Sequence, residues 1–385
     1  MLHDGYSFEK HLQYLGVTSN TTSRTFKPVP LLNGYFGTFD SAMLERVLAD
    51  PGVQSVDHHT IGSIDNDWES TTPEPHINIM TELDQPIGRC ADPNPLVQTP
   101  APWWLSQLAE WSGQDTHMDT PSSIFPRDAA ATGKGATIYI LDTGFDVSGW
   151  PSEWKTSGQY DFTGTSPQDT HGHGTCSASA AAGAYFGVAK DASLVNMKIG
   201  VGSNVSSQAA TKAINTIFDL EAVEHIGNPF RPNPVISMSF TVPNDRMLSA
   251  AIKKFNGRAA FIAGAGNKLG DGANNFPCGM DGVICVGATD KRRNRWKVTV
   301  GSVAYGSAAG SKVRFIGPGS GVSCAWLGGK TKTSVQGTSF LGAFGRRSCG
   351  ALPVPRGRPN QLPGRPATLA EPWSWRQPRM ETYHL

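Results

Sequence analysis

Short apolar runs alternate with helical stretches between residues 134 and 340, and this alternation restricts the fold more than any other feature of the sequence. Runs of this kind, bounded by turn residues, predict buried strands. The predicted strands are Ala136–Leu141, Leu194–Ile199, Val235–Met238, Ala260–Ala263, Val283–Val286 and Val313–Ile316. The helices expected between them include Thr175–Ala182, Ser206–Phe218 and Asp245–Phe255. Strands that are apolar throughout need cover on both sides, so we predict an α/β fold, a mostly parallel sheet with helices on both faces.

Two polar residues stand at the ends of predicted strands. Asp142 follows Ala136–Leu141 directly, and Asn267 lies shortly after Ala260–Ala263. Functional sites of parallel sheets gather at the carboxyl ends of the strands. Both side chains are therefore expected at the site.

Residues 1–62 show a different pattern, which is typical of a small α+β unit. The predicted elements are helices at Phe8–Leu15 and at Asp40–Ala49, the second capped by Asp40 or Ser41, and strands at Tyr35–Phe39 and Val53–Val56. Residues 63–100 lose this periodicity and are interpreted as a linker, with irregular chain continuing to about residue 128. Residues 101–345 form the predicted main domain. Prolines interleaved with arginines predict a disordered tail at residues 346–385.

The net charge of +1 gives no electrostatic reason to expect nucleic acid or an acidic membrane surface as a partner. No apolar run approaches the ~18 residues of a membrane-spanning helix. The chain does not open with a basic segment followed by an apolar stretch, so no signal peptide is visible. Either the protein is cytosolic or the chain starts late.

The six cysteines show neither CxxC pairing nor the spacing of metal ligands. Cys278 and Cys285 are close enough in sequence to form a disulfide. Cys285 also lies in a predicted strand, and simple packing in the core is the favoured interpretation. The sequons Asn20-Thr21-Thr22 and Asn204-Val205-Ser206 mildly favour secretion.

Four local sequences supply the groups that a serine needs in order to hydrolyse an amide. The reaction requires a nucleophile, a base, a carboxylate that orients the base, and donors for the oxyanion. The sequences are Leu141-Asp142-Thr143-Gly144, Gly172-His173-Gly174-Thr175, Ala265-Gly266-Asn267 and Gly337-Thr338-Ser339. Each is modest evidence alone, whereas their order, spacing and strand context together are strong evidence.

With these motifs the chain resembles the subtilisin-like serine proteases, especially the secreted fungal ones of the proteinase K kind. The resemblance covers roughly residues 5–60 and 100–340. It extends to Gly187-Val188-Ala189, Val235-Ile236-Ser237-Met238-Ser239-Phe240, Val286-Gly287-Ala288-Thr289 and Phe315-Ile316-Gly317-Pro318-Gly319. The resemblance implies a subtilisin-like fold and a secreted, extracellular serine endopeptidase that acts on proteins or peptides and requires no cofactor. Calcium often stabilises this family as a structural ion, but no dense carboxylate cluster indicates a site here.

The resemblance also implies roles for single residues. Asp142 resembles the orienting carboxylate, His173 the general base and Ser339 the nucleophile. Asn267 resembles the side-chain oxyanion donor, which acts with the backbone N–H of Ser339.

Substrate contacts follow from the same resemblance. Ser239-Phe240-Thr241 resembles the strand that pairs with the substrate backbone and forms a wall of the pocket for the residue before the cut, although the family usually has glycine where Thr241 stands. Gly264 and Gly266 are expected to line the same pocket and to leave space for a fairly large apolar side chain. The alternative is that both glycines serve only tight turns before Asn267.

Only one of His171 and His173 can be the base, and the His-Gly-Thr pattern of the family fits His173. His171 is then a loop residue beside it. A His-x-His pair also suits zinc, but no third ligand with suitable spacing accompanies it, so no metal site is predicted.

Residues 1–62 resemble the inhibitory propeptide of the family, which assists folding and is then removed. Ala101-Pro102-Trp103 resembles the start of mature family members. The first strand of the propeptide is short or missing here, from which we expect an N-terminally truncated chain.

The chain departs from the family after Ser339. The family continues into a helix of the form Ala-Ala-Pro-x-Val-Ala-Gly, whereas Leu341–Arg347 and then the proline-rich tail follow here. A catalytic domain that is C-terminally incomplete, with impaired activity, is therefore expected. Two alternatives stay open: an impaired subtilase-like protein that only binds or inhibits proteases, and an intracellular regulatory subtilase.

Overall fold

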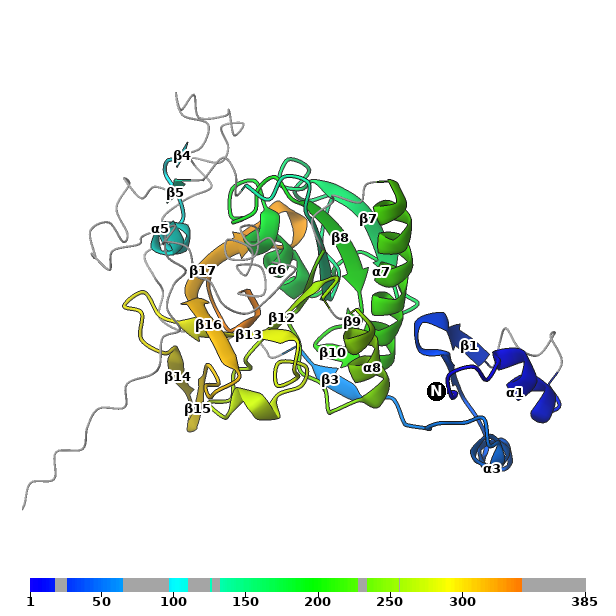
Figure 1. Cartoon of the computed structure of the whole chain (residues 1–385). Coiled ribbons are helices and arrows are strands. Elements are labelled where there is room, and N and C mark those ends of the chain that lie inside the picture. Colours follow the sequence, from blue (N-terminus) through cyan, green and yellow to red (C-terminus); the bar gives the residue numbers. More distant parts are fainter. Residues whose placement is uncertain are drawn as a thin grey trace, which may run out of the picture.

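A seven-stranded sheet forms the centre of the protein (Figure 1). The computed structural model describes residues 1–17, 26–64, 97–109, 125–126, 132–227, 234–255 and 257–340. The strands of the sheet are β6 (Thr137–Asp142), β7 (Thr156–Asp161), β8 (Ser193–Lys198), β11 (Val235–Met238), β12 (Ala260–Gly264), β13 (Val283–Thr289) and β16 (Val313–Pro318). Their order is β16-β13-β12-β11-β6-β8-β7, and every described pairing between them is parallel. The predicted α/β class is confirmed.

Helices cover both faces of this sheet, as predicted. They are α6 (His173–Ala182), α7 (Ser207–Gly227) and α8 (Arg246–Lys254). Along β6, Tyr139 and Leu141 belong to a cluster with apolar residues of α7 and α8, whereas Ile138 and Ile140 cluster with α6. Successive strand residues face opposite sides, so a run that is apolar throughout is stable only between two helical layers. No helix in the described ranges combines the length and apolarity needed to cross a membrane.

The N-terminal unit, described at residues 1–17 and 26–64, is a small α+β fold beside α7 and α8 (Figure 1). Its elements are α1 (Phe8–Tyr14), β1 (Phe26–Val29), β2 (Gly34–Gly37), α3 (Ser41–Ala49) and β3 (Ile61–Ser63). Asp40, one of the two predicted caps, caps α3 by accepting a 2.8 Å hydrogen bond from the Met43 N–H. The backbone N–H of Leu31 donates to Asn215 Oδ1 of α7 at 3.0 Å, which ties the unit to the main domain.

A buried polar network joins the two helices of this unit. His11 Nδ1 lies 2.7 Å from Asp50 Oδ2, and His11 Nε2 lies 2.8 Å from the Tyr35 hydroxyl. Burial acts to raise the pKa of Asp50, but hydrogen bonds from the Gly52 N–H, His11 and Tyr6 outweigh it and hold that pKa below its usual value. A carboxylate with these donors stays ionised inside the unit.

One predicted strand in this unit is wrong. Val53–Val56 is not a strand, because Val53 forms only a single bridge with Leu2 and the N–H groups of Gln54 and Ser55 both donate to Met1 O. The partner of β2 is instead β1, which the prediction missed. Pro28 lies inside β1 and lacks a backbone donor, which is compatible with the edge of a sheet but hides a strand from sequence patterns.

Several other elements were not predicted. They are the edge strand β7, the helix α5 (Trp103–Ala109), the hairpin β14 (Lys297–Val300) with β15 (Val303–Gly306), and the hairpin β17 (Ser320–Ala325) with β18 (Thr331–Gln336). The prediction of irregular chain up to about residue 128 is wrong at α5. This short helix depends on tertiary contacts, since Trp104 is fully buried and Trp103 Nε1 donates to Gly321 O at 2.9 Å. Residues 65–96 of the predicted linker, residues 110–124 and the predicted tail lie outside the described residues.

β3 joins the N-terminal unit to the main domain through backbone pairing. It is an edge of a three-stranded antiparallel sheet with β10 (Asn204–Ser206) and β9 (Gly200–Val201). On its other side, Ser63 forms an antiparallel bridge with Thr241. The chain at residues 61–64 is therefore held between two segments of the main domain.

Two disulfides join described cysteines. Cys176 of α6 is bonded to Cys324 of β17, a pairing that sequence reasoning did not identify. Cys278 is bonded to Cys285. The favoured interpretation of Cys285 as a simple core residue is thus wrong, because this fully buried residue lies in β13 and also forms the bridge. Cys90 and Cys349 lie outside the described residues.

The two disulfides are expected to differ in their effect on stability. Cys176–Cys324 spans 148 residues and Cys278–Cys285 spans seven, so the loop-entropy model predicts that the longer link stabilises by about 2–3 kcal/mol more. Denaturant unfolding of the two paired Cys→Ser variants tests this. Equal losses of unfolding free energy in both variants would contradict the expectation.

Candidate active site

Asp142 and His173 form a buried pair at the carboxyl edge of the sheet. Asp142 is the last residue of β6 and His173 is the first residue of α6. His173 Nδ1 lies 2.7 Å from Asp142 Oδ1, and both side chains are almost completely buried. The same carboxylate oxygen accepts from the Thr143 N–H at 2.7 Å. The structure thus brings two of the predicted residues into direct contact.

Asp169 organises the turn that leads to His173. Its Oδ1 accepts from the Thr143 hydroxyl at 2.9 Å and from the N–H groups of His171 and Gly172 at 2.8 and 3.0 Å. Its Oδ2 accepts from the Thr175 N–H at 3.0 Å and from the Thr175 hydroxyl at 2.6 Å. Sequence reasoning missed this residue. The signal was an aspartate shortly before a predicted helix, the position at which carboxylates bind the free N–H groups of the first turn.

Two glycines around His173 allow the backbone to pack closely. Gly172 has a φ of 100°, and a Cβ at this position would overlap the ring of Trp326. A Cβ on Gly174 would overlap the carbonyl oxygen of Gly144, which lies two residues after Asp142. Side chains at either position would push α6 away from the end of β6 and separate His173 from Asp142.

His171 lies beside the pair without joining it. Its ring centroid is 6.3 Å from that of His173. Burial lowers the pKa of His171, and the neighbouring His173 lowers it further. Among the described residues, no group of three His, Cys, Asp or Glu side chains is arranged to hold a metal ion.

Asn267 is oriented by Thr338. Asn267 Oδ1 accepts from the Thr338 N–H at 2.9 Å and from the Thr338 hydroxyl at 3.0 Å. Thr338 Oγ1 in turn accepts from the Gly266 N–H at 3.1 Å. Because the amide oxygen of Asn267 is held by two donors, its NH₂ group must point away from Thr338. Thr338 is a second orienting residue that sequence reasoning did not single out.

Ser339 follows Thr338 directly and lies beside Ser239. Its backbone oxygen accepts from the Ser239 hydroxyl at 2.6 Å, and the residue is 5% exposed. The ring of the next residue, Phe340, is 5.9 Å from the ring of His173. Residues 338–340 thus contact Asn267, Ser239 and His173. The predicted departure from the family after Ser339 begins at residue 341, outside the described residues, and stays a prediction.

The predicted substrate strand, Ser239-Phe240-Thr241, lies beside Ser339. Phe240 is 4% exposed, and the N–H and carbonyl of Thr241 both pair with Ser63. Gly264 packs against Thr338, because a Cβ there would lie 2.8 Å from Thr338 Oγ1. Gly266 has a φ of 96° and packs against Asn275. Both glycines allow close approach in this structure, and a pocket for a large apolar side chain beside them stays a prediction.

A family model described as the subtilase family matches residues 133–344. The chain belongs to the subtilase family. The matched segment contains Asp142, His173, Asn267 and Ser339, and the sheet that positions them.

Individual relatives are fungal proteases. Alkaline serine protease ver112 of Corniculantispora psalliotae is 27% identical over 311 residues, which cover 80% of this chain and 69% of that protein. Subtilisin-like protease 2 of Pseudogymnoascus destructans is 31% identical over 238 residues, 60% of this chain and 55% of the relative. Alkaline protease 1 of Aspergillus flavus is 29% identical over 245 residues, which cover 63% of this chain and 56% of that protein. The chain thus spans little more than half the length of the last two relatives. A solved cold-adapted subtilisin-like serine proteinase is 25% identical and has a TM-score of 0.48, with 63% of this chain and 81% of that chain covered.

The lowered pKa of His171 predicts how the folding stability of the protein changes with pH. As the pH falls below the ordinary value of about 6.5, the unfolded chain binds the proton before the folded chain does, so stability falls with the pH in this range. A His171→Gln variant is expected to lose this part of the pH dependence. Melting temperatures of both proteins between pH 7.5 and 5 measure the difference, and parallel curves would contradict the prediction.

Proposed function

We propose that this subtilase is a serine endopeptidase in which Ser339 attacks the peptide carbonyl, His173 is the general base and Asp142 orients it. The observation that carries the proposal is the buried 2.7 Å contact between Asp142 Oδ1 and His173 Nδ1. A carboxylate at Nδ1 keeps the proton on that nitrogen, so that Nε2 is the basic one. It also stabilises the imidazolium that forms once the base has taken a proton.

Ser339, His173 and Asn267 each have a separate role in the proposed reaction. The hydroxyl proton of Ser339 passes to His173 Nε2 as the oxygen attacks, and the oxyanion is stabilised by the Asn267 NH₂ group and the backbone N–H of Ser339. His173 then gives the proton to the leaving amine, and water releases the acyl group by the same route. The two bonds from Thr338 support this assignment, because they fix the Asn267 amide before the substrate arrives.

We further propose that the N-terminal unit inhibits the same site. Thr241 follows Ser239 and Phe240 directly, and its backbone N–H and carbonyl are both occupied by Ser63. An extended substrate that adds a strand at this edge needs the same backbone groups. Residues 61–64 therefore hold the position of a substrate strand, and proteolysis requires that they leave it.

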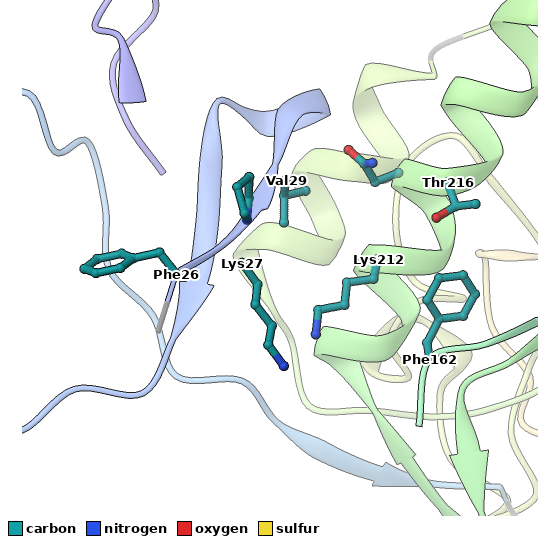
Figure 2. A pocket seen from close by; sticks show the side chains of 8 residues that line it. Phe26, Lys27, Val29, Phe162, Lys212 and Thr216 are labelled. Atoms are coloured by element: carbon teal, nitrogen blue, oxygen red, sulfur yellow. The ribbon is translucent and has the colours of Figure 1, made fainter. Parts of the chain in front are cut away.

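A like-charged contact favours the later release of this unit. A pocket between β1 and α7 is lined by Lys27 of β1 and Lys212 of α7, and both side chains extend into the space between these two elements (Figure 2). Burial lowers the pKa of Lys212, and the nearby Lys27 lowers it further. The remaining residues of the lining are Phe26, Pro28, Val29, Phe162, Asn215 and Thr216. Repulsion between the two ammonium groups weakens the contact between the unit and the main domain.

We also propose that the protein acts outside the cell. The two disulfides support this, since such bonds persist in oxidising compartments and are rare in the cytosol. The sequon at Asn204 lies in β10 with its side chain exposed, where a glycan could be attached.

Labelling with a fluorophosphonate tests the proposed nucleophile. The purified chain is expected to be labelled, and Ser339→Ala is expected to lose the label completely. Asn267→Leu keeps the nucleophile and the base but removes the oxyanion donor, so kcat should fall by about 10²–10³, the loss found in subtilisin itself, while KM changes little. A folded chain whose N-terminal unit has been released and that is still not labelled at Ser339 would refute the endopeptidase.

A charge reversal tests the release of the N-terminal unit. Lys212→Glu would pair with Lys27 and should slow the labelling of Ser339 relative to Lys212→Gln, which removes the repulsion without adding attraction. An ion pair at the protein surface contributes about 0.2–1 kcal/mol, which corresponds to a change of up to about fivefold that disappears at high salt. Equal labelling rates of the two variants at low salt would show that this contact does not limit release.

A further inference from the structure

Gly62 lies in the position proposed for a substrate strand, between Thr241 and β10, which we call the cleft. No side chain fits at this point. Gly62 is the middle residue of β3 and pairs with Val205 of β10. A Cβ added to Gly62 would lie 2.5 Å from both Cα and Cγ1 of Val242, and closer still to the carbonyl oxygen of Thr241. Real Cβ atoms essentially never approach other heavy atoms closer than 3.0 Å. Two of these three neighbours are backbone atoms, so a change of rotamer cannot make the space.

Hydrogen bonds on both sides prevent the strand from shifting to admit a side chain. Ser63 N–H donates to Thr241 O at 2.8 Å, and Thr241 N–H donates to Ser63 O at 2.9 Å. On the opposite side, Ile64 N–H donates to Ser203 O at 2.8 Å. A movement of the backbone at Gly62 away from Val242 would break one of these pairs or press the strand into β10.

The two isoleucines nearest to Gly62 in the sequence differ in their exposure to solvent. Ile61 is 56% exposed, whereas Ile64 is 1% exposed and belongs to the main apolar cluster of the protein. The position two residues after the glycine is therefore an enclosed apolar site. The cleft excludes a side chain at one position and surrounds an aliphatic side chain at another.

The register relates these positions to the site of attack. The two chains of an antiparallel pair run in opposite directions. The residues that follow the partner of Thr241 therefore lie opposite Phe240 and then Ser239. In a bound substrate, the second residue after the one paired with Thr241 would lie opposite Ser239, whose hydroxyl contacts the backbone oxygen of Ser339. A substrate strand in this register places its glycine three residues before the residue opposite Ser239.

We propose that the cleft selects peptides with glycine at the position of Gly62 and an aliphatic residue at the position of Ile64. This inference rests on the proposed endopeptidase and specifies its substrate class: extended Gly-x-aliphatic segments. The N-terminal unit carries that sequence itself, as Gly62-Ser63-Ile64, and so occupies the cleft as a matched but displaceable strand.

Hydrogen exchange in the full chain tests the steric exclusion without any need for catalysis. Gly62→Ala is expected to release the strand, so that the amides of Ser63, Ile64 and Thr241 exchange at least about tenfold faster. Ser63→Ala is the matched control, because it changes a neighbouring side chain and leaves the backbone pairing intact. Unchanged protection in Gly62→Ala would overturn the proposal.

Peptide cleavage tests the substrate preference. The enzyme is the full-length Gly62→Ala chain, whose cleft is expected to be open, and the probe is an internally quenched peptide that copies residues 58–69. The Gly62→Ala peptide should show kcat/KM about tenfold to a hundredfold below the parent, and the Ile64→Asp peptide should be equally poor. The Ser63→Ala peptide should match the parent.

The outcomes separate this inference from the proposed activity. Cleavage of the parent and the Gly62→Ala peptide at equal rates would overturn the glycine selectivity while the endopeptidase stands. If no peptide is cleaved and Ser339 is not labelled, the proposed activity fails. The exchange rates of the Gly62→Ala chain then still decide whether the cleft excludes a side chain.

Discussion

The parallel register of β6, β11 and β12 is the constraint on which the candidate site depends. Leu141, Met238 and Ala263 lie side by side in the hydrogen-bonded ladders. The residues that follow them, Asp142, Ser239 and Gly264, therefore emerge at the same edge and level. Because side chains alternate between the faces of a strand, a slip of one residue would turn Asp142 away from His173 and separate Ser239 from Ser339. The apolar packing of two helical layers against the sheet fixes this register, so the geometry of the candidate site depends on the packed core.

The sheet alone does not orient the side chains at its edge. Asp169 collects five hydrogen bonds around the turn that begins α6, and Thr338 holds the amide of Asn267 with two. Asp169 acts by positioning the turn before His173, and Thr338 acts by positioning the amide of Asn267. A buried carboxylate with this many donors is costly to rearrange, so the turn before His173 has one strongly favoured geometry.

The central strands and the Asp142–His173 pair could be predicted because their signals are local. An apolar run marks each central strand, Asp142 and Asn267 follow such runs, and the His-Gly-Thr pattern marks His173. The edge strand β7 could not be found in this way, since one of its faces is solvated and its apolar signal is weak. The link between Cys176 and Cys324 depends on a contact across 148 residues, which no local pattern encodes. The contact of Ser63 with Thr241 is equally remote in sequence and became visible only from the packing of two units.

The Cys176–Cys324 bond has a consequence for a protein exposed to proteolysis. It connects the helix that begins at His173 to the hairpin that leads to Ser339. A single cut in the chain between the two cysteines would leave both pieces covalently attached, each still carrying part of the site. Such a nicked molecule would run as two fragments only after reduction, and the loops within this span could be cut without separating the base from the nucleophile.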